Sequence, residues 1–172
     1  YRMYPSGDNN TKNPFFDNLY RDRRDIHHDL NANLYAIVKL PFGFEYQMNF
    51  TPRYHWYEYM NHESAEHPEW AGDGGRSERK NEKTFNWQVD NILRWKKEFG
   101  EDHRVEATFL QNAEKGQWWK TVAQNKLYSP SDILGFHNIG AGTAPSVSSE
   151  DTYKTGDALM GRLFYSFKDK YM

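Results

Sequence analysis

The chain of 172 residues has 22 basic and 24 acidic side chains, a formal net charge of −2, and no cysteine. This balance gives no electrostatic footprint for nucleic acid, and the absence of cysteine excludes disulfides, thiolate metal sites and thiol nucleophiles. Only 37% of the residues are hydrophobic, yet 17% are aromatic, which is too many for a disordered chain. A wide membrane barrel accounts for both values, because its apolar side chains lie on one face and its aromatic rings at two rims.

The N-terminal part is predicted to be a loop followed by a long strand. Residues 1–23 are polar and rich in turn-forming residues. From about 26 to 40, apolar and polar residues alternate with the period of two that a strand imposes on its two faces. Pro41-Phe42-Gly43 predicts a tight turn at 41–43.

A second strand, from 44 to about 59, shows the alternation best. It runs for about 15 residues, against about 5 to 6 for a usual soluble strand. Pro52 lies inside it and has no N–H to donate, so a bulge or local break is expected there. The apolar and aromatic side chains that share one parity are Phe44, Tyr46, Met48, Phe50, Tyr54 and Trp56.

Three further strands are predicted over about 83–99, 103–115 and 155–168. In the third and fourth strands Asn91 and Gln111 fall on the apolar parity, while Ile92 and Leu110 fall on the polar one. A one-residue bulge would switch the parity, although its place cannot be read from sequence.

The connections alternate between short and long. Outer-membrane barrels have short periplasmic turns and long extracellular loops, and such long loops are unusual in a compact soluble domain. The predicted extracellular loops are 1–23, 61–82 and 116–153, and the predicted periplasmic turns are 41–43, 100–102 and 169–171.

Aromatic spacing provides an independent test of the membrane hypothesis. Tyr46 and Trp56 share a face ten residues apart, as do Phe85 and Trp95 on the next, oppositely directed strand. Ten residues span roughly 34 Å of strand, or roughly 26 Å along the membrane normal at a tilt of about 40°, against an apolar band of about 25 Å. Each strand therefore places aromatic rings at both membrane interfaces, where they are favoured.

The predicted fold is all-β: an antiparallel transmembrane β-barrel segment of about five long strands. Five strands cannot close a barrel, and an open edge in lipid leaves backbone groups unsatisfied, so further strands are expected. No stretch approaches about 18 consecutive apolar residues, and the N-terminus carries no signal peptide. These observations favour an internal piece of a longer chain.

The last stretch carries the most specific resemblance to a known family. Residues 161–171, Gly-Arg-Leu-Phe-Tyr-Ser-Phe-Lys-Asp-Lys-Tyr, closely resemble a strand and turn of the SusC/RagA family of TonB-linked outer-membrane receptors. Residues 99–107 resemble the family's strand–turn–strand, with Arg104 in place of the usual Asn. Residues 13–15 and 31–34 are similar to the preceding part of that barrel.

The resemblance implies an outer-membrane importer of oligosaccharides or peptides in Bacteroidetes-type bacteria. It implies a barrel of about 22 strands around a plug, a SusD-like surface lipoprotein as lid, energy from the TonB–ExbB–ExbD complex, and contact with outer-membrane lipid. The plug and the TonB box are not in this sequence. The alternative function is a secreted all-β glycan-binding module, which would have shorter strands, a closed core and one aromatic patch.

No catalytic, cofactor or metal site is predicted, and the chain is not expected to be an enzyme. His62 and His67 are five residues apart, whereas the zincin motif needs a spacing of four on one helical face. Adjacent His27 and His28 would point to opposite faces of a strand. Glu63 and Glu66 lie in a predicted loop that gives no reason for the raised pKa that a glycosidase acid requires.

A glycine-rich stretch, three aromatic residues and a set of charged residues are also candidate binding features. The glycine-rich stretch 72–75 lacks the lysine of a phosphate loop and the carboxylates of an EF-hand, so a turn is expected. Trp118 and Trp119 are assigned to the outer aromatic girdle in preference to sugar stacking, and Tyr128 stays open between the two. A charged wall facing the lumen or plug is predicted from Arg53, His55, Asp90, Arg94 and Arg162.

Overall fold

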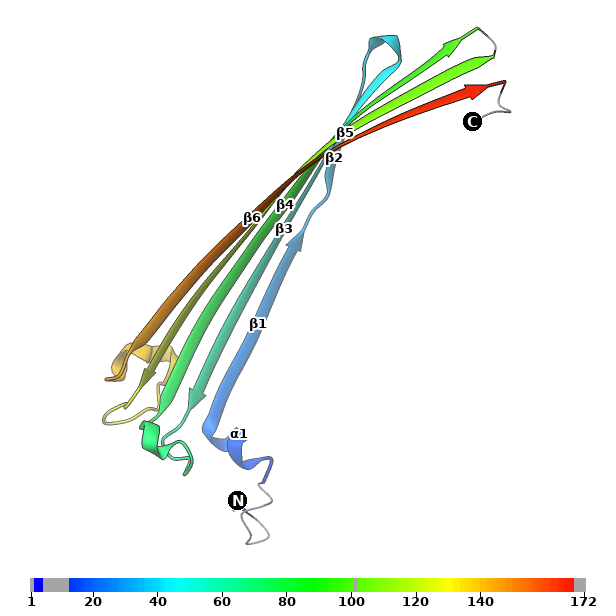
Figure 1. The fold of residues 1–172 in the computed structure, drawn as a ribbon. Coiled ribbons are helices and arrows are strands. Elements are labelled where there is room, and N and C mark those ends of the chain that lie inside the picture. Colours follow the sequence, from blue (N-terminus) through cyan, green and yellow to red (C-terminus); the bar gives the residue numbers. More distant parts are fainter. Residues whose placement is uncertain (1, 5–12, 101, 169–172) are drawn as a thin grey trace. The chain divides into compact units, whose positions relative to one another are not determined.

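The computed structural model describes residues 2–4, 13–100 and 102–168, and its main feature is one sheet of long strands (Figure 1). The sheet order is β1-β3-β4-β5-β6, and β2 pairs with β3 beside β1. Neighbouring strands run in opposite directions, so the all-β antiparallel prediction is confirmed. The strands are β1 (Arg21–Asn31), β2 (Leu34–Lys39), β3 (Phe44–Glu63), β4 (Arg76–Phe99), β5 (His103–Lys126) and β6 (Ser146–Phe167).

Short helical turns connect or precede these strands. The α-helix α1 (Phe16–Tyr20) leads into β1, and the 3-10 helix η1 (Pro41–Gly43) joins β2 to β3. The 3-10 helices η2 (Ala71–Asp73) and η3 (Gly135–Ala141) lie in the two long connections. Among the described residues, no helix is long and apolar enough to cross a membrane.

The prediction of a single first strand over 26–40 is wrong, because the edge of the sheet is split into β1 and β2. The split at 32–33 lies opposite Pro52: the Ala32 N–H donates to the Pro52 carbonyl at 3.1 Å, but Pro52 has no N–H to return to the ladder. β3 itself continues through Pro52. The break expected at the proline therefore occurs in its partner strand.

The strands also run further than predicted into the long connections. β3 and β4 enter 61–82 from both sides, β5 and β6 enter 116–153, and α1 with the start of β1 lies inside 1–23. Residues 76–80 are polar on both parities, so the alternation that marks a strand is missing there although the backbone ladder continues. Backbone hydrogen bonds sustain a ladder whatever the side chains are.

The short turns have left-handed residues. In η1 the φ angles of Phe42 and Gly43 are 65° and 84°. Gly100, between β4 and β5, has a φ of 65°, while part of the predicted turn 100–102 and all of 169–171 lie outside the described residues.

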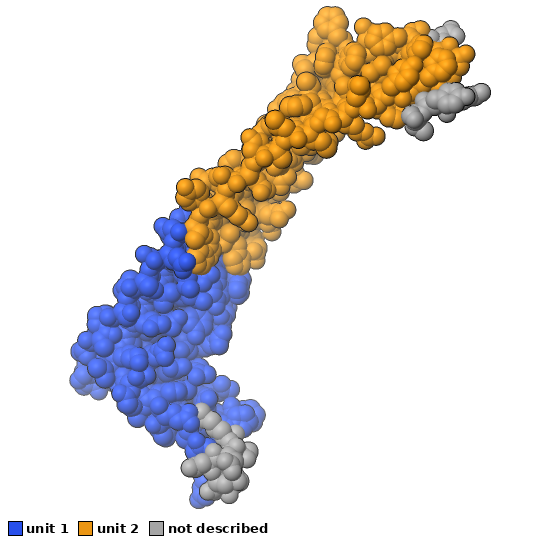
Figure 2. Space-filling view, viewed as in Figure 1, with its two compact units in different colours: residues 1–28, 56–83, 119–151 blue, residues 29–55, 84–118, 152–172 orange. Residues whose placement is uncertain are grey.

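The described chain divides into two compact units (Figure 2). Unit 1 comprises residues 1–28, 56–83 and 119–151, and its buried side chains include Phe16, Phe136 and His67. Unit 2 comprises residues 29–55, 84–118 and 152–172. Among the described residues of unit 2 no apolar side chain is buried, so its sheet has no core of its own.

Candidate functional site

One face of the sheet in unit 2 collects the residues of the apolar parity. In the antiparallel register of β2 and β3, Ala36 lies opposite Met48 and Val38 opposite Tyr46. Across β3 and β4, the ring of Phe44 lies 6.1 Å from Trp95 and that of Tyr54 5.9 Å from Phe85. We call this the apolar face, and its exposed members include Leu34, Val38, Phe44, Met48, Leu93, Phe109, Leu159 and Leu163.

A line of polar side chains crosses the same face on four consecutive strands. The Tyr46 hydroxyl donates to Asn91 Oδ1 at 2.6 Å, and Asn91 Nδ2 donates to Gln111 Oε1 at 2.7 Å. Gln111 Nε2 then donates to Asp157 Oδ1 at 3.2 Å. We call these four residues the polar ladder.

The bulge expected near Asn91 and Gln111 is not found. Asp90 accepts a hydrogen bond from Asn112, and Lys96 pairs with Glu106. The two contacts are six residues apart on β4 and also six residues apart on β5, so neither strand has an extra residue between them. Asn91 and Gln111 therefore lie on the apolar face, as their parity indicates, and each satisfies the other.

The opposite face of unit 2, which we call the polar face, is held by paired charges and amides. Arg94 donates to Glu45 at 3.1 Å and to Gln47 at 2.8 Å. Asp90 accepts hydrogen bonds from Asn112 at 2.6 Å and from Gln88 at 3.1 Å.

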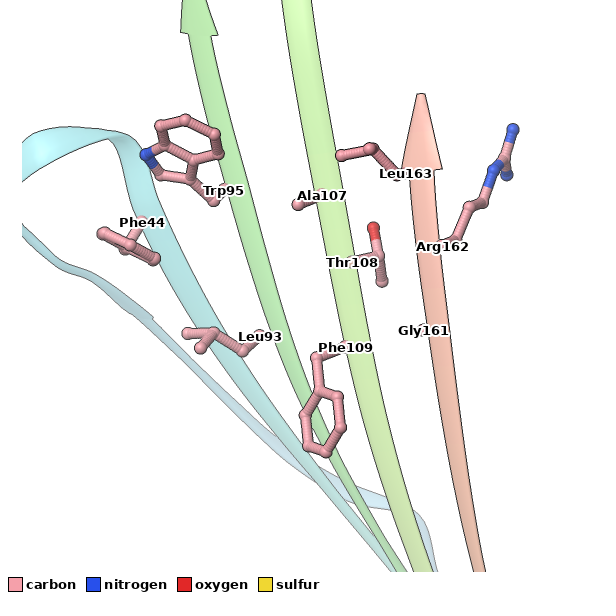
Figure 3. A pocket seen from close by; sticks show the side chains of 9 residues that line it. All are labelled: Phe44, Leu93, Trp95, Ala107, Thr108, Phe109, Gly161, Arg162 and Leu163. Atoms are coloured by element: carbon pink, nitrogen blue, oxygen red, sulfur yellow. The ribbon is translucent and has the colours of Figure 1, made fainter. Parts of the chain in front are cut away.

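The predicted charged wall is partly assembled on this face. Asp90 and Arg94 belong to the network just described, and His55 Nδ1 lies 2.6 Å from Asp29. Arg53 lines a depression of about 200 Å³ together with Asn86, Glu114, Gly116 and Lys154. In Figure 3 the side chains of Arg162 and Leu163 leave β6 on opposite sides.

Unit 1 contains a cluster of aromatic and charged side chains on β1, β3 and β4. Tyr57 stacks on His27 with a centroid distance of 4.5 Å. Lys80 Nζ lies 4.8 Å from the ring of Tyr57 and 5.4 Å from that of Tyr59, and Arg23 lies 5.2 Å from the ring of Tyr59. We call Arg23, Asp25, His27, Tyr57, Tyr59 and Lys80 the aromatic–cation cluster.

Hydrogen bonds and burial shift the pKa values of Asp25 and Tyr57 within the cluster. The Arg23 guanidinium donates to Asp25 at 2.9 Å and lowers the pKa of that carboxyl below its ordinary value, and the hydrogen bond from Tyr57 acts in the same direction. Burial, followed by the 2.7 Å hydrogen bond to Asp25, raises the pKa of Tyr57 to about 12. These residues lie beyond Trp56, outside the predicted apolar band.

Sequence reasoning missed this cluster. Tyr57 and Tyr59 fall on the polar parity of β3, opposite to Tyr54 and Trp56. The other residues of that parity include Gln, Asn, Arg and His. The presence of two tyrosines among them could have indicated the cluster.

His62 and His67 have separate structural roles. His62 Nδ1 lies 2.9 Å from Ser77 Oγ and its Nε2 3.5 Å from Asp132. His67 is fully buried and stacks on Trp70 with a centroid distance of 3.9 Å. Among the described residues, no group of three or more His, Cys, Asp or Glu side chains could hold a metal ion.

The hydrogen bonds of His67 define its tautomer. The Glu69 backbone N–H donates to Nδ1 at 3.1 Å, so Nδ1 is the acceptor. Nε2 must then carry a proton, which it donates to Asp17 Oδ1 at 3.1 Å. Both ring nitrogens are occupied by protein partners.

The other loop features are also structural. Glu63 pairs with Arg21 at 3.0 Å, and Asp73 pairs with Lys126 at 2.8 Å. Residues 72–75 end η2 in a turn where Gly74 has a φ of 59°.

The prediction that both tryptophans lie in the outer girdle is wrong for Trp118, which lies on the polar face. Trp118 and Trp119 are adjacent within the continuous strand β5, so their side chains point to opposite faces. Trp119 has the parity of Gln111, and Trp118 that of Asn112. Tyr128 packs edge-on against His62 with a centroid distance of 6.4 Å.

The chain is similar in sequence to a TonB-dependent receptor and in fold to solved structures of a peptide transporter. No family model matches the chain. The TonB-dependent receptor P26 of Formosa agariphila is 26% identical over 106 residues, which are 60% of this chain and 10% of that protein. The structure of the RagAB peptide transporter matches 98% of this chain and 19% of the solved one, with a TM-score of 0.80 and 16% identity.

The predicted resemblance to SusC/RagA-type TonB-dependent receptors is confirmed. The RagAB peptide importer in its "open-open" state gives a TM-score of 0.78 at 16% identity, over 99% of this chain and 19% of that one. At such identity the structural match establishes the fold. The structures matched are those of a peptide transporter.

The SusC/RagA-type resemblance covers a small part of a long protein. The chain spans about a tenth of the curated receptor and about a fifth of the RagAB structures that it matches. Within that part, the described residues form the apolar face and the polar face in unit 2 and the aromatic–cation cluster in unit 1.

Proposed function

We propose that these residues form part of the barrel wall of an outer-membrane TonB-dependent nutrient importer of the SusC/RagA type. The observation that carries the proposal is the two-sided sheet of unit 2. Its apolar side chains are exposed, with Leu163 75% and Leu34 59% accessible, and its opposite face is polar and internally paired. A soluble protein rarely exposes so extended an apolar surface, whereas a membrane barrel needs it.

In this function the apolar face meets outer-membrane lipid and the polar face lines the lumen. The short turns 41–43, 100–102 and 169–171 lie in the periplasm, and the connections within 1–23, 61–82 and 116–153 lie outside the cell. The remaining strands and the plug belong to the rest of the polypeptide. A SusD-like lipoprotein covers the importer, and TonB–ExbB–ExbD energises it through parts outside these residues.

The aromatic–cation cluster is the part of the wall best suited to touch cargo. Tyr57 and Tyr59 offer rings, and Arg23, Asp25 and Lys80 offer charges and hydrogen bonds, a combination that serves either an oligosaccharide or a peptide. The RagAB structures concern a peptide transporter, and peptide is accordingly the first cargo to test.

The first test is the intact denatured mass of the polypeptide isolated from its source. Since the chain spans 19% of the matched RagAB structures, a mass of about five times the 20.5 kDa of this chain is expected. A soluble, folded monomer of 20.5 kDa would overturn the importer and support the secreted glycan-binding module.

The second test labels the two faces separately. The 172 residues contain no cysteine, so Met48→Cys and Asn49→Cys report on adjacent positions of opposite faces. A nitroxide at position 48 is expected to be accessible to oxygen dissolved in the bilayer, and one at position 49 to a water-soluble relaxation agent. Equal water accessibility at both positions would contradict the membrane assignment.

A further inference from the structure

A groove lies on the apolar face of unit 2, across β3 to β6 (Figure 3). Its volume is about 380 Å³. The apolar side chains that line it are Phe44, Leu93, Trp95, Ala107, Phe109 and Leu163, together with Gly161.

Two small residues on neighbouring strands make the floor of the groove. Ala107 on β5 and Gly161 on β6 lie between larger side chains, among them Trp95 and Leu163 (Figure 3). A Cβ placed on Gly161 would meet no atom within 4 Å. The floor is therefore low because its side chains are small, and no neighbouring side chain fills it.

The two ends of the groove differ in polarity. One end lies beside Phe109, two residues from Gln111 of the polar ladder. At the other end Lys97 follows Trp95 by two residues on the same parity, and its Nζ lies 5.1 Å from the ring of Phe99. Lys97 lies near the short turn of the β4–β5 hairpin, and the polar ladder lies nearer the middle of these strands.

The length between these ends corresponds to one leaflet of a membrane. Lys97 and Asn91 are six residues apart on β4, roughly 20 Å of strand. At a tilt of about 40° this is roughly 16 Å along the membrane normal, somewhat more than half of an apolar band of about 25 Å.

Lys97 is also available to an anionic group. Its neighbour Lys96, on the polar face, pairs with Glu106 at 3.4 Å, whereas no carboxylate of the described residues pairs with Lys97. At the same end of the apolar face, His103 Nδ1 lies 2.7 Å from the Tyr165 hydroxyl. A cation and hydrogen-bonding groups at an interface, followed by an apolar channel, match the order of headgroup and tail in a phospholipid.

We propose that this groove binds one phospholipid of the leaflet at the short-turn side, with its phosphate at Lys97 and part of an acyl chain over Ala107 and Gly161. The proposal rests on the proposed membrane function. It assigns the groove to a bound lipid with a preferred headgroup charge, beyond the general contact that any barrel makes with its bilayer.

The test uses the full-length protein, purified in detergent and titrated with phosphatidylglycerol under native mass spectrometry. Gly161→Leu fills the floor of the groove and should weaken binding of the tightest lipid about tenfold, since about two methylenes lose their contact. The control, Ala36→Leu, places the same leucine side chain on the apolar face of β2 and should leave binding unchanged.

The headgroup is tested by Lys97→Gln, with Lys39→Gln on the polar parity of β2 as control. Lys97→Gln should weaken phosphatidylglycerol about fivefold, the contribution of one cation near a lipid phosphate. Binding by Gly161→Leu equal to that of the unaltered protein, or no change with Lys97→Gln, would overturn the proposal. Failure of the membrane function itself is distinguishable, because the unaltered protein would then be water-soluble without detergent and bind no lipid.

Discussion

The amide of Asn91 on β4 donates to the amide oxygen of Gln111 on β5 at 2.7 Å, on the face that otherwise carries apolar side chains. Tyr46 and Asp157 extend the line to β3 and β6. Polar groups on a surface facing lipid are costly unless they find partners. The relationship therefore predicts strong coupling between the two amides.

Asn91→Leu alone should destabilise the barrel by about 1 to 3 kcal/mol, because Tyr46 and Gln111 each lose a partner. The double variant Asn91→Leu/Gln111→Leu should lose less than the sum of the two single losses, because neither amide is then left facing an apolar replacement of the other. Tyr46 and Asp157 still each lose one partner in that variant. Urea unfolding from detergent or vesicles measures both. A double variant that loses the full sum of the two single losses would show that the amides do not interact.

Gly43 in the first short turn should not tolerate a side chain. Its φ is 84°, and a Cβ would overlap the backbone carbonyl of Lys96. Gly43→Ala combines left-handed strain of about 1 to 2 kcal/mol with that overlap. Gly100→Ala is the control, because its φ is 65° and no atom lies within 4 Å of the added carbon. Equal unfolding midpoints for the two variants would refute the clash.

The Asp25 carboxyl should make stability depend on acid pH. Because Arg23 and Tyr57 lower its pKa in the folded state, its contribution is present above the ordinary value of 3.8 and lost as pH falls through the folded value. Arg23→Gln should reduce this loss, whereas Arg53→Gln, outside the cluster, should not. Thermal unfolding from pH 6 down to about pH 2 tests it, and identical profiles for Arg23→Gln and the unaltered protein would contradict it.

Removal of His67 should loosen the connection between β3 and β4. His67→Ala takes a fully buried ring away from Trp70 and removes one hydrogen bond to Asp17. We expect a loss of about 2 to 5 kcal/mol by comparison with other large core truncations. Limited proteolysis should then cut within 64–75. The exposed Glu66→Ala is the control. A chelator should leave the cleavage pattern of the unaltered protein unchanged, and chelator-induced cleavage would instead indicate a bound metal.

Much of the sheet could be predicted because its strands obey one period. The parity of residues 44–56 correctly assigned the apolar face, and the parity of Asn91 and Gln111 proved more reliable than the bulge invoked to explain it. Alternation fades at residues 76–80, where both faces are polar, so the ends of the strands could not be located. The backbone hydrogen bonds that continue the strand there do not depend on side-chain type, so the sequence does not indicate them.

The clusters of unit 1 were harder to predict, because they depend on contacts between distant segments. Nothing in the local sequence of His67 indicates that Asp17 and Trp70 enclose it. The stacking of Tyr57 on His27 likewise depends on the register of β1 against β3, which side-chain period alone does not define.

The unbroken register between Asp90–Asn112 and Lys96–Glu106 restricts how the length of this protein can change. Deleting a single residue between Asp90 and Lys96 would turn the rest of β4 over, carrying the charge of Arg94 to the apolar face and Trp95 to the polar one. Removing two residues would keep each side chain on its own face and shorten the strand. Viable insertions and deletions inside the hairpin should therefore come in even numbers, while those in the long connections can be of any length.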